Sequence, residues 1–370
     1  MDSVQVVFEG LGLTFNIKRV AFTIGEITVY WYGVIIALGF LLAILYAIRN
    51  SPRFGLDPDR VIDVAIGSII AGIIGARLYY VLFSFNDYKD DPISIFKIWE
   101  GGLAILGGVI GALIVAVFLC RWRKISFKAT ADMASIGLLV GQGIGRWGNY
   151  LNQEAFGTNT TLPWGMYSSE TYVQLAMNQA KLAENGITVD PTLPVHPCFL
   201  YESLWCLLGC VLLYLYINKR RFDGEMILMY AAWYGFGRFF IEGLRVDSLM
   251  LGKIRVSQLL SALICIAAIV AIIIIRSKIK RNKDPEYLKL YCKTEESIAM
   301  LEDRARLVKE EKEKRAAKKS KNIVFDEVSD DKKTAVDDSL AEDIDGAENP
   351  LESHDEADND EAEQEETDND

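Results

Sequence analysis

Residues 141–157 read Gly-Gln-Gly-Ile-Gly-Arg-Trp-Gly-Asn-Tyr-Leu-Asn-Gln-Glu-Ala-Phe-Gly and lie at the end of an apolar run. Arg146 and Glu154 therefore sit close to a segment hydrophobic enough to cross a bilayer. A charged side chain near the bilayer interior costs at least about 2.5 kcal/mol, so such residues are expected to serve a function. The glycines let a ligand approach the backbone and permit a break in the helix. They favour a functional site over the alternative that the charges merely sit among lipid headgroups.

The composition is that of a basic membrane protein with an acidic tail. Hydrophobic residues make up 51% of the 370 residues, yet the formal net charge is -11. Residues 321–370 contain 21 Asp or Glu and 3 Lys, so residues 1–320 carry a net charge of +7. We expect residues 277–320 to form a charged cytoplasmic helix and residues 321–370 to form a disordered acidic tail. Truncation after about Lys283 is expected to leave activity intact.

Hydropathy predicts an all-α polytopic membrane protein with about seven transmembrane helices. The loops after the first, third, fifth and seventh of these segments are rich in Arg and Lys, which places them in the cytoplasm by the positive-inside rule. The N-terminus is then outside and the C-terminus cytoplasmic. The start of the chain lacks a basic segment followed by an apolar core, so no cleaved signal peptide is expected. The predicted spans are 28–48, 62–84, 102–120, 130–150, 197–217, 225–244 and 256–275.

This topology divides the chain into an outer segment, 1–27, and a seven-span domain, 28–276. An outer loop, 151–196, lies near the expected site and contains a predicted helix from about Ser168 to Gly186. Polar groups from different spans converge in the outer half of the membrane. They are Tyr32, Arg77, Arg146, Asn149, Glu202, Arg238 and Glu242.

The converging arginines indicate an anionic ligand, because a guanidinium binds phosphate in bidentate fashion. Tyr234, Arg238 and Glu242 are spaced at i, i+4 and i+8, so they share one helix face, with Arg245 one turn beyond. Confinement of the polar groups to one leaflet favours a site that opens to the outer face. A transport pathway would place such groups at several depths and in matching repeats.

Metal and cofactor chemistry find no support in the sequence. The six cysteines are scattered without a CxxC pair, and the only histidines are His196 and His354. Cys206 and Cys210 share one face of an apolar span, where small buried hydrophobic residues are expected. We expect neither a metal nor a cofactor.

Residues 145–157 resemble the signature G-R-x-G-N-[aromatic]-[aliphatic]-N-x-E-x-x-G of the prolipoprotein diacylglyceryl transferase family. Further motifs resemble the same family in the same order, and the resemblance covers roughly residues 20–280. These motifs are Trp31–Gly33, Gly75–Arg77, Trp99–Gly102, His196–Glu202 and Tyr234–Glu242, with Arg245.

The resemblance implies transfer of the diacylglyceryl group of phosphatidylglycerol to the lipobox cysteine of a preprolipoprotein, with release of glycerol 1-phosphate. The expected partners are phosphatidylglycerol, the signal peptide with its lipobox cysteine, and the membrane, not nucleic acid. The expected location is the bacterial cytoplasmic membrane. The resemblance implies catalytic roles for Arg146, Arg238, Glu154 and Tyr32. It implies substrate binding by Arg146, Asn149, Asn152, Gly157, Glu202, Tyr234 and Glu242.

One position departs from the family pattern. Many members have a histidine before the Gly-Gly pair of the third span, where this chain has Leu106, which cannot take a proton. A carboxylate such as Glu154 or Glu202 is then the candidate proton acceptor, and His196 is expected to be structural. Two alternatives to the transferase stay open: a transporter or binding protein for an anionic lipid or metabolite, and a purely structural membrane subunit.

Overall fold

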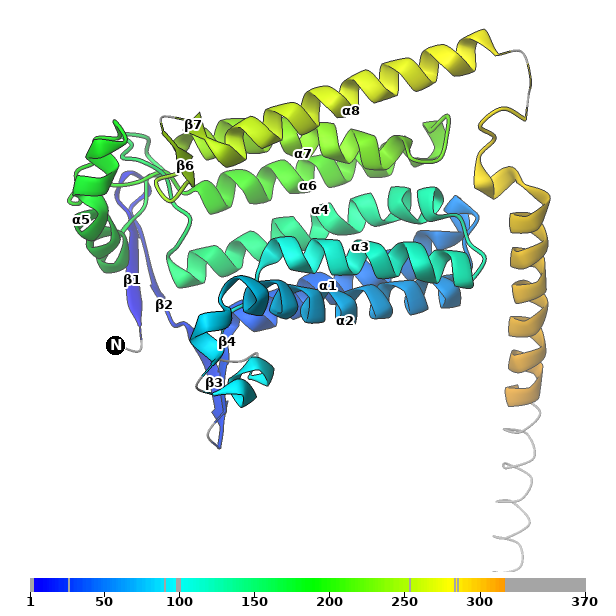
Figure 1. Ribbon diagram of the computed structural model, residues 1–370, viewed down its shortest axis with the longest axis horizontal. Helices are drawn as coiled ribbons and strands as arrows, with labels where there is room; N and C mark the ends of the chain where they lie inside the picture. The colour runs from blue at the N-terminus through cyan, green and yellow to red at the C-terminus, as the bar shows by residue number, and fades with distance from the viewer. Residues whose placement is uncertain are drawn as a thin grey trace, which may run out of the picture. The chain divides into compact units, whose positions relative to one another are not determined.

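The computed structural model describes residues 3–25, 27–89, 91–97, 101–252, 254–282, 284 and 286–316. The chain forms two units, Met1–Arg304 and Ala305–Asp370, and the helix bundle belongs to the first. Long helices lie side by side in this bundle (Figure 1). They are α1 (Trp31–Asn50), α2 (Pro58–Phe83), α3 (Ile105–Trp122), α4 (Phe127–Asn152), α6 (Cys198–Tyr216), α7 (Glu225–Leu244) and α8 (Val256–Arg281).

Each of the seven segments expected from hydropathy overlaps one of these helices. Five of them, α1, α2, α3, α6 and α8, are long and apolar enough to cross a membrane. The other two, α4 and α7, carry Arg146, Arg238 and Glu242 of the expected site, and these charged residues lower their hydropathy. Both pack against α6 and against each other, and α4 also packs on α1. Their polar groups are therefore covered by neighbouring helices instead of facing lipid.

Helices α2 and α3 approach each other closely through glycines, which is typical of membrane helix packing. A Cβ atom at Gly75 would lie 2.5 Å from the carbonyl oxygen of Gly107, and one at Gly111 would lie 2.6 Å from the carbonyl oxygen of Ala71. Larger side chains at these positions would push the two helices apart.

Short strands and one further helix gather at one end of the bundle (Figure 1), and no strand is expected from the sequence. Strands β1 (Val4–Phe8), β2 (Leu13–Ile17) and β5 (Tyr167–Ser168) form an antiparallel sheet in the order β2-β1-β5. Strands β3 (Val20–Ile24) and β4 (Ile27–Tyr30) pair with each other, as do β6 (Met250–Leu251) and β7 (Ile254–Arg255). The fold is therefore mainly α-helical, and the short strands are an addition to the all-α fold expected from the sequence.

Helix α5 (Ser169–Glu184) confirms the helix expected in the long loop after α4. Ser168 caps it by accepting a hydrogen bond from the Thr171 amide, and Gly186 follows it with a left-handed φ of 76°. Leu175 and Leu182 of this helix are buried with Val6 and Phe8 of β1 in a small core of their own. This core fixes α5 at the strand-bearing end of the bundle.

At the opposite end of the bundle the chain after α8 packs on the inter-helix loops. The Ser297 hydroxyl donates to the Gly55 carbonyl oxygen at 2.7 Å, and the Tyr291 amide donates to Asp223 at 2.6 Å. Arg304 forms ion pairs with Asp57 and Asp59. Met300 joins the main hydrophobic core. Residues 286–304 are thus part of the folded unit, while the acidic tail expected at 321–370 lies outside the described residues.

Candidate active site

Glu202 on α6 joins three helices of the bundle. Its carboxylate oxygens lie 2.8 Å from Arg146 Nη2 of α4 and 2.8 Å from Arg238 Nη1 of α7. The Tyr234 hydroxyl of α7 donates to the same carboxylate at 3.0 Å. Glu202 is only 2% exposed, so its charge requires these partners. The residues that hold it are the ones expected from the sequence.

Arg238 lies between two buried carboxylates. Its Nη2 atom is 2.6 Å from Glu242, one helical turn further along α7. Tyr234, Arg238 and Glu242 therefore share a face, as their spacing predicts. The cluster of Arg146, Arg238, Glu202 and Glu242 contains two cations and two anions, so its charges balance without a ligand. An incoming phosphate would compete with the carboxylates for guanidinium groups that are already oriented.

A second polar network continues from Arg146 to the end of α4. Arg146 Nη1 donates to Asn149 Oδ1 at 3.3 Å, and Asn149 Nδ2 donates to Glu154 Oε1 at 2.9 Å. Asn152 Nδ2 lies 3.5 Å from the same oxygen. Gln153 ends α4 with a left-handed φ of 55°, which turns the chain back so that the Glu154 amide bonds to the Asn149 carbonyl oxygen. These hydrogen bonds hold the side chains of residues 146–154 in one connected network.

Two glycines are explained by close packing at this site. A Cβ atom at Gly148 would lie 2.5 Å from the ring of Tyr32, which rests on α4 at this point. A Cβ atom at Gly157 would lie 2.7 Å from the Cβ atom of His196 and 3.1 Å from the carbonyl oxygen of Leu244. Gly157 therefore allows three chain segments to meet, a packing role that accounts for it without a direct contact to substrate.

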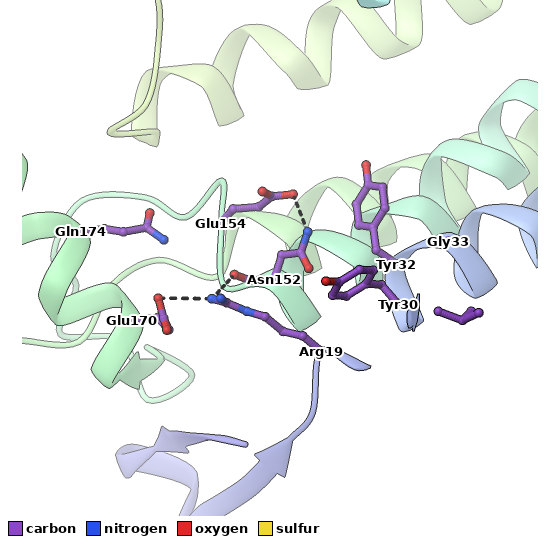
Figure 2. A pocket seen from close by; sticks show the side chains of 9 residues that line it. Arg19, Tyr30, Tyr32, Gly33, Asn152, Glu154, Glu170 and Gln174 are labelled. Atoms are coloured by element: carbon purple, nitrogen blue, oxygen red, sulfur yellow. Dashed lines mark hydrogen bonds and ion pairs between the residues drawn. The ribbon is translucent and has the colours of Figure 1, made fainter. Parts of the chain in front are cut away.

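An open cavity of about 830 Å³, lined by both polar and apolar surface, lies beside Glu154. Figure 2 shows Tyr30 and Tyr32 at the start of α1 on one side and Glu170 and Gln174 of α5 on the other, with Asn152 and Glu154 between them. Arg19 crosses below, bound to the Asn152 carbonyl oxygen at 3.0 Å and to Glu170 at 3.2 Å. Tyr32, Asn152 and Glu154 are expected from the sequence, but Arg19, between β2 and β3, and Glu170 and Gln174 of α5 are not. Their remote positions in the chain carry no motif that would signal the contact.

Two arginines expected near the cluster have other partners. Arg77 donates to carbonyl oxygens of the α2–α3 loop, including those of Ser94 and Gly101 at 2.6 Å. Arg245 lies beyond the end of α7 and pairs with Asp247 at 2.6 Å. Both stabilise loops. Of the arginines expected to converge, Arg146 and Arg238 therefore remain as the ones that contact Glu202.

His196 has a structural environment, as expected. Its Nδ1 atom lies 3.1 Å from the Tyr201 hydroxyl, and its backbone pairs with Gly157 and Thr158. Burial lowers the pKa of His196, so the ring is neutral at neutral pH. Within the part of the chain that the structure describes, no group of three or more His, Cys, Asp or Glu side chains is arranged to hold a metal ion.

The fold and the site define a helical multi-pass membrane protein with a buried arginine–glutamate cluster at one end of its bundle. The family model of prolipoprotein diacylglyceryl transferase matches residues 19–274. The chain belongs to this family. The matched region contains every residue of the cluster.

Relatives of known name agree with this assignment, and each is called phosphatidylglycerol–prolipoprotein diacylglyceryl transferase. The protein of Limosilactobacillus reuteri is 42% identical over 272 residues, which are 72% of this chain and 94% of the relative. That of Listeria welshimeri is 44% identical over 261 residues, covering 70% and 90%. That of Pediococcus pentosaceus is 41% identical over 274 residues, covering 74% and 95%.

Proposed function

We propose that this protein transfers the diacylglyceryl group of phosphatidylglycerol to the thiol of the lipobox cysteine of a prolipoprotein. The observation that carries the proposal is the convergence of Arg146 and Arg238, from two helices, on the single buried carboxylate of Glu202. Such a pair of oriented guanidinium groups suits a phosphate diester that gains charge during the reaction. The names of the family and of the relatives indicate the reaction and its two substrates.

In this reaction the thiolate sulfur attacks the glyceryl carbon that bears the phosphate. A carbon–sulfur bond forms, the carbon–oxygen bond to phosphate breaks, and the departing oxygen keeps the electron pair. Glycerol 1-phosphate leaves with one more negative charge than the diester carried. Arg146 and Arg238 stabilise that charge, and Asn149 and Tyr32 donate hydrogen bonds to the headgroup.

The thiol proton needs an acceptor in a chain that has Leu106 at the position of the family histidine. Glu202 is committed to two guanidinium groups. Glu154 accepts hydrogen bonds from Asn149 and Asn152 and lines the open cavity. Glu154 is therefore our candidate for the general base.

We place the site in the outer half of a bacterial cytoplasmic membrane, with seven spans, residues 1–27 outside and the C-terminus in the cytoplasm. The residues of the arginine–glutamate cluster lie near the end of α4, the start of α6 and the end of α7. These helix ends are on the side of the bundle that carries the strands and α5, and the Arg- and Lys-rich loops between helices are at the opposite end (Figure 1). The positive-inside rule then supports this orientation. In the domain scheme that follows, residues 28–276 are catalytic, with the loop 151–196 outside and 277–370 inside.

A mass-shift assay tests the proposal on the full-length chain in detergent with phosphatidylglycerol and a synthetic lipobox peptide. The wild type should add one diacylglyceryl group to the cysteine peptide and none to a serine peptide. Arg146→Ala should lower the rate by at least about 100-fold, the scale for losing a preorganised charge-stabilising donor. Arg49→Ala, an exposed arginine at the far end of α1, is the matched control.

Near wild-type transfer by a folded Arg146→Ala variant would contradict the role given to this arginine. Uptake of phosphatidylglycerol or an anionic metabolite into proteoliposomes, without cleavage of the lipid, would instead indicate a transporter.

A further inference from the structure

The cavity beside Glu154 has a wall that the reaction with phosphatidylglycerol does not require. This wall consists of Arg19, between strands β2 and β3, and of Glu170 and Gln174 on α5. Glu170 and Gln174 lie on the side of Glu154 away from α1, and the Arg19 side chain reaches across to Glu170 from beside the start of α1 (Figure 2). The transfer needs two substrates, so the second substrate could bind in this region next to the site.

The chemistry of the lining argues against either part of the donor lipid. The cavity has polar and apolar surface in similar amounts, and Val29 is the single aliphatic side chain of its lining, so an acyl chain would find no aliphatic wall to pack against. Two carboxylates, Glu154 and Glu170, border the cavity, and the guanidinium of Arg19 is already paired with Glu170 at 3.2 Å. A phosphate would meet uncompensated negative charge here.

An extended polypeptide matches the same lining. Its backbone amides are donors that carboxylate oxygens accept, and its carbonyl oxygens are acceptors for amide and phenol groups. The volume of about 830 Å³ falls within the usual range of ligand sites. A peptide lying here would run past Glu154, which is linked through Asn149 to Arg146. Its thiol would then reach the phosphate-bearing carbon from the side opposite the arginine cluster.

We propose that this cavity binds the polypeptide segment that follows the acceptor cysteine, with Glu170 accepting hydrogen bonds from its backbone amides. The inference rests on the proposed function, because it takes the acceptor to be a polypeptide. Glu170 thereby becomes a specificity residue for the acceptor and not for the lipid. Arg19 positions it, since its guanidinium holds both Glu170 and the last turn of α4.

The ion pair between Arg19 and Glu170 can be changed without unfolding the protein. The two side chains are 41% and 33% exposed, and exposed ion pairs contribute little to stability. Glu170→Gln also keeps the shape of the side chain in the first turn of α5. Glu184, the exposed last residue of the same helix, provides a control of equal charge change, Glu184→Gln.

The test uses two fluorescent lipobox peptides in which serine replaces the cysteine, so that binding is measured without reaction. One peptide ends at the serine and the other continues for six further residues. Wild type should bind the longer peptide more tightly. Glu170→Gln should weaken binding of the longer peptide by about tenfold, the effect of losing one hydrogen bond to a charged group. It should leave the shorter peptide unaffected, and Glu184→Gln should change neither affinity.

Equal loss for both peptides, no loss for the longer one, or no binding of either by the wild type would overturn the proposal. So would a rise in KM for phosphatidylglycerol in Glu170→Gln, with the KM for a cysteine peptide unchanged, since the cavity would then serve the lipid. Binding with the expected pattern but no mass shift on a cysteine peptide would support the peptide site and contradict the proposed transfer.

Discussion

At the scale of single residues, Glu202 determines the geometry of the site. A carboxylate this buried must be satisfied, and its partners are the two arginines and the Tyr234 hydroxyl. The arginines are thereby held in place before any substrate binds. Preorganised charges of this kind stabilise a transition state without reorganisation during the reaction.

The titration of His196 gives a prediction of pH dependence. Burial lowers its pKa below the value of about 6.5 in the unfolded chain. The folded state therefore loses stability as the pH falls below about 6.5, until the ring is protonated in both states. Thermal unfolding in detergent should show a melting temperature that decreases between pH 7.5 and pH 5.

The variant His196→Asn removes the titrating ring, so it separates the contribution of His196 to the pH dependence of stability from that of other titrating groups. Its melting temperature should change less over the same pH range than that of the wild type. An identical pH dependence in both proteins would show that His196 does not contribute.

The sequence predicts the motif residues and their partners on neighbouring spans, but it does not predict the contacts made by segments outside the spans. The spacing in residues 145–157 placed Arg146, Asn149, Asn152 and Glu154 together, and they form one network. Arg19 contacts this network from 133 residues earlier in the chain. No local pattern encodes such a contact, because it depends on how the turn between β2 and β3 folds over α4.

At the scale of elements, α7 depends on another helix for its N-terminal cap. Gly224 precedes α7 and has no side chain to cap it. The buried carboxylate of Asp132, on α4, accepts hydrogen bonds from the amides of Gly224 and Ile227 at 2.8 and 3.0 Å. This contact fixes the start of the helix that carries Arg238.

Replacing Asp132 should destabilise the bundle through α7. Asp132→Ala leaves the two amides without their acceptor and should cost about 1–2 kcal/mol. Asp132→Asn keeps one acceptor oxygen and should cost less. Melting temperatures in detergent measure both variants, and an Asp132→Ala protein as stable as the wild type would contradict the capping role.

Hydropathy predicts the seven helices of the bundle but none of the strands that the described residues form. The strands are two to five residues long, and it is the sheet of β1, β2 and β5 that packs against α5. Val4, Val6 and Phe8 do alternate with more exposed residues, which is the period-two signal of a strand. Five residues are too few for this alternation to predict a strand in a chain whose hydropathy pattern is otherwise helical.

At the scale of the whole molecule, the folded unit extends beyond the region shared with the family. The family model ends at residue 274, yet residues 286–304 pack on the loops at the far end of the bundle from α5. Gly55 has a left-handed φ of 76° and lies directly against Ser297 and Cys292. Composition predicts a charged helix over residues 277–320, whereas the structure has a short 3-10 helix at Tyr291–Lys293, a helix from residue 295, and buried side chains at Ser297 and Met300.

The packing predicts that truncation at residue 283 lowers stability, while the expectation that activity stays intact remains a separate prediction. A chain ending at residue 316 should melt at the wild-type temperature. A chain ending at residue 283 loses the Ser297, Met300 and Arg304 contacts and should melt roughly 5 °C lower, equivalent to about 2 kcal/mol. Equal melting temperatures for both truncations would show that residues 286–304 add no stability.

The measurement that tests the central claim most directly is a double-mutant cycle of transfer rates. It compares kcat/KM for the wild type, Arg146→Ala, Arg238→Ala and the double variant, each verified as folded. Because one carboxylate orients both arginines and both are assigned to one phosphate, their losses should not add. The double variant should stay within about tenfold of the slower single variant. Losses that multiply independently would contradict a shared phosphate site.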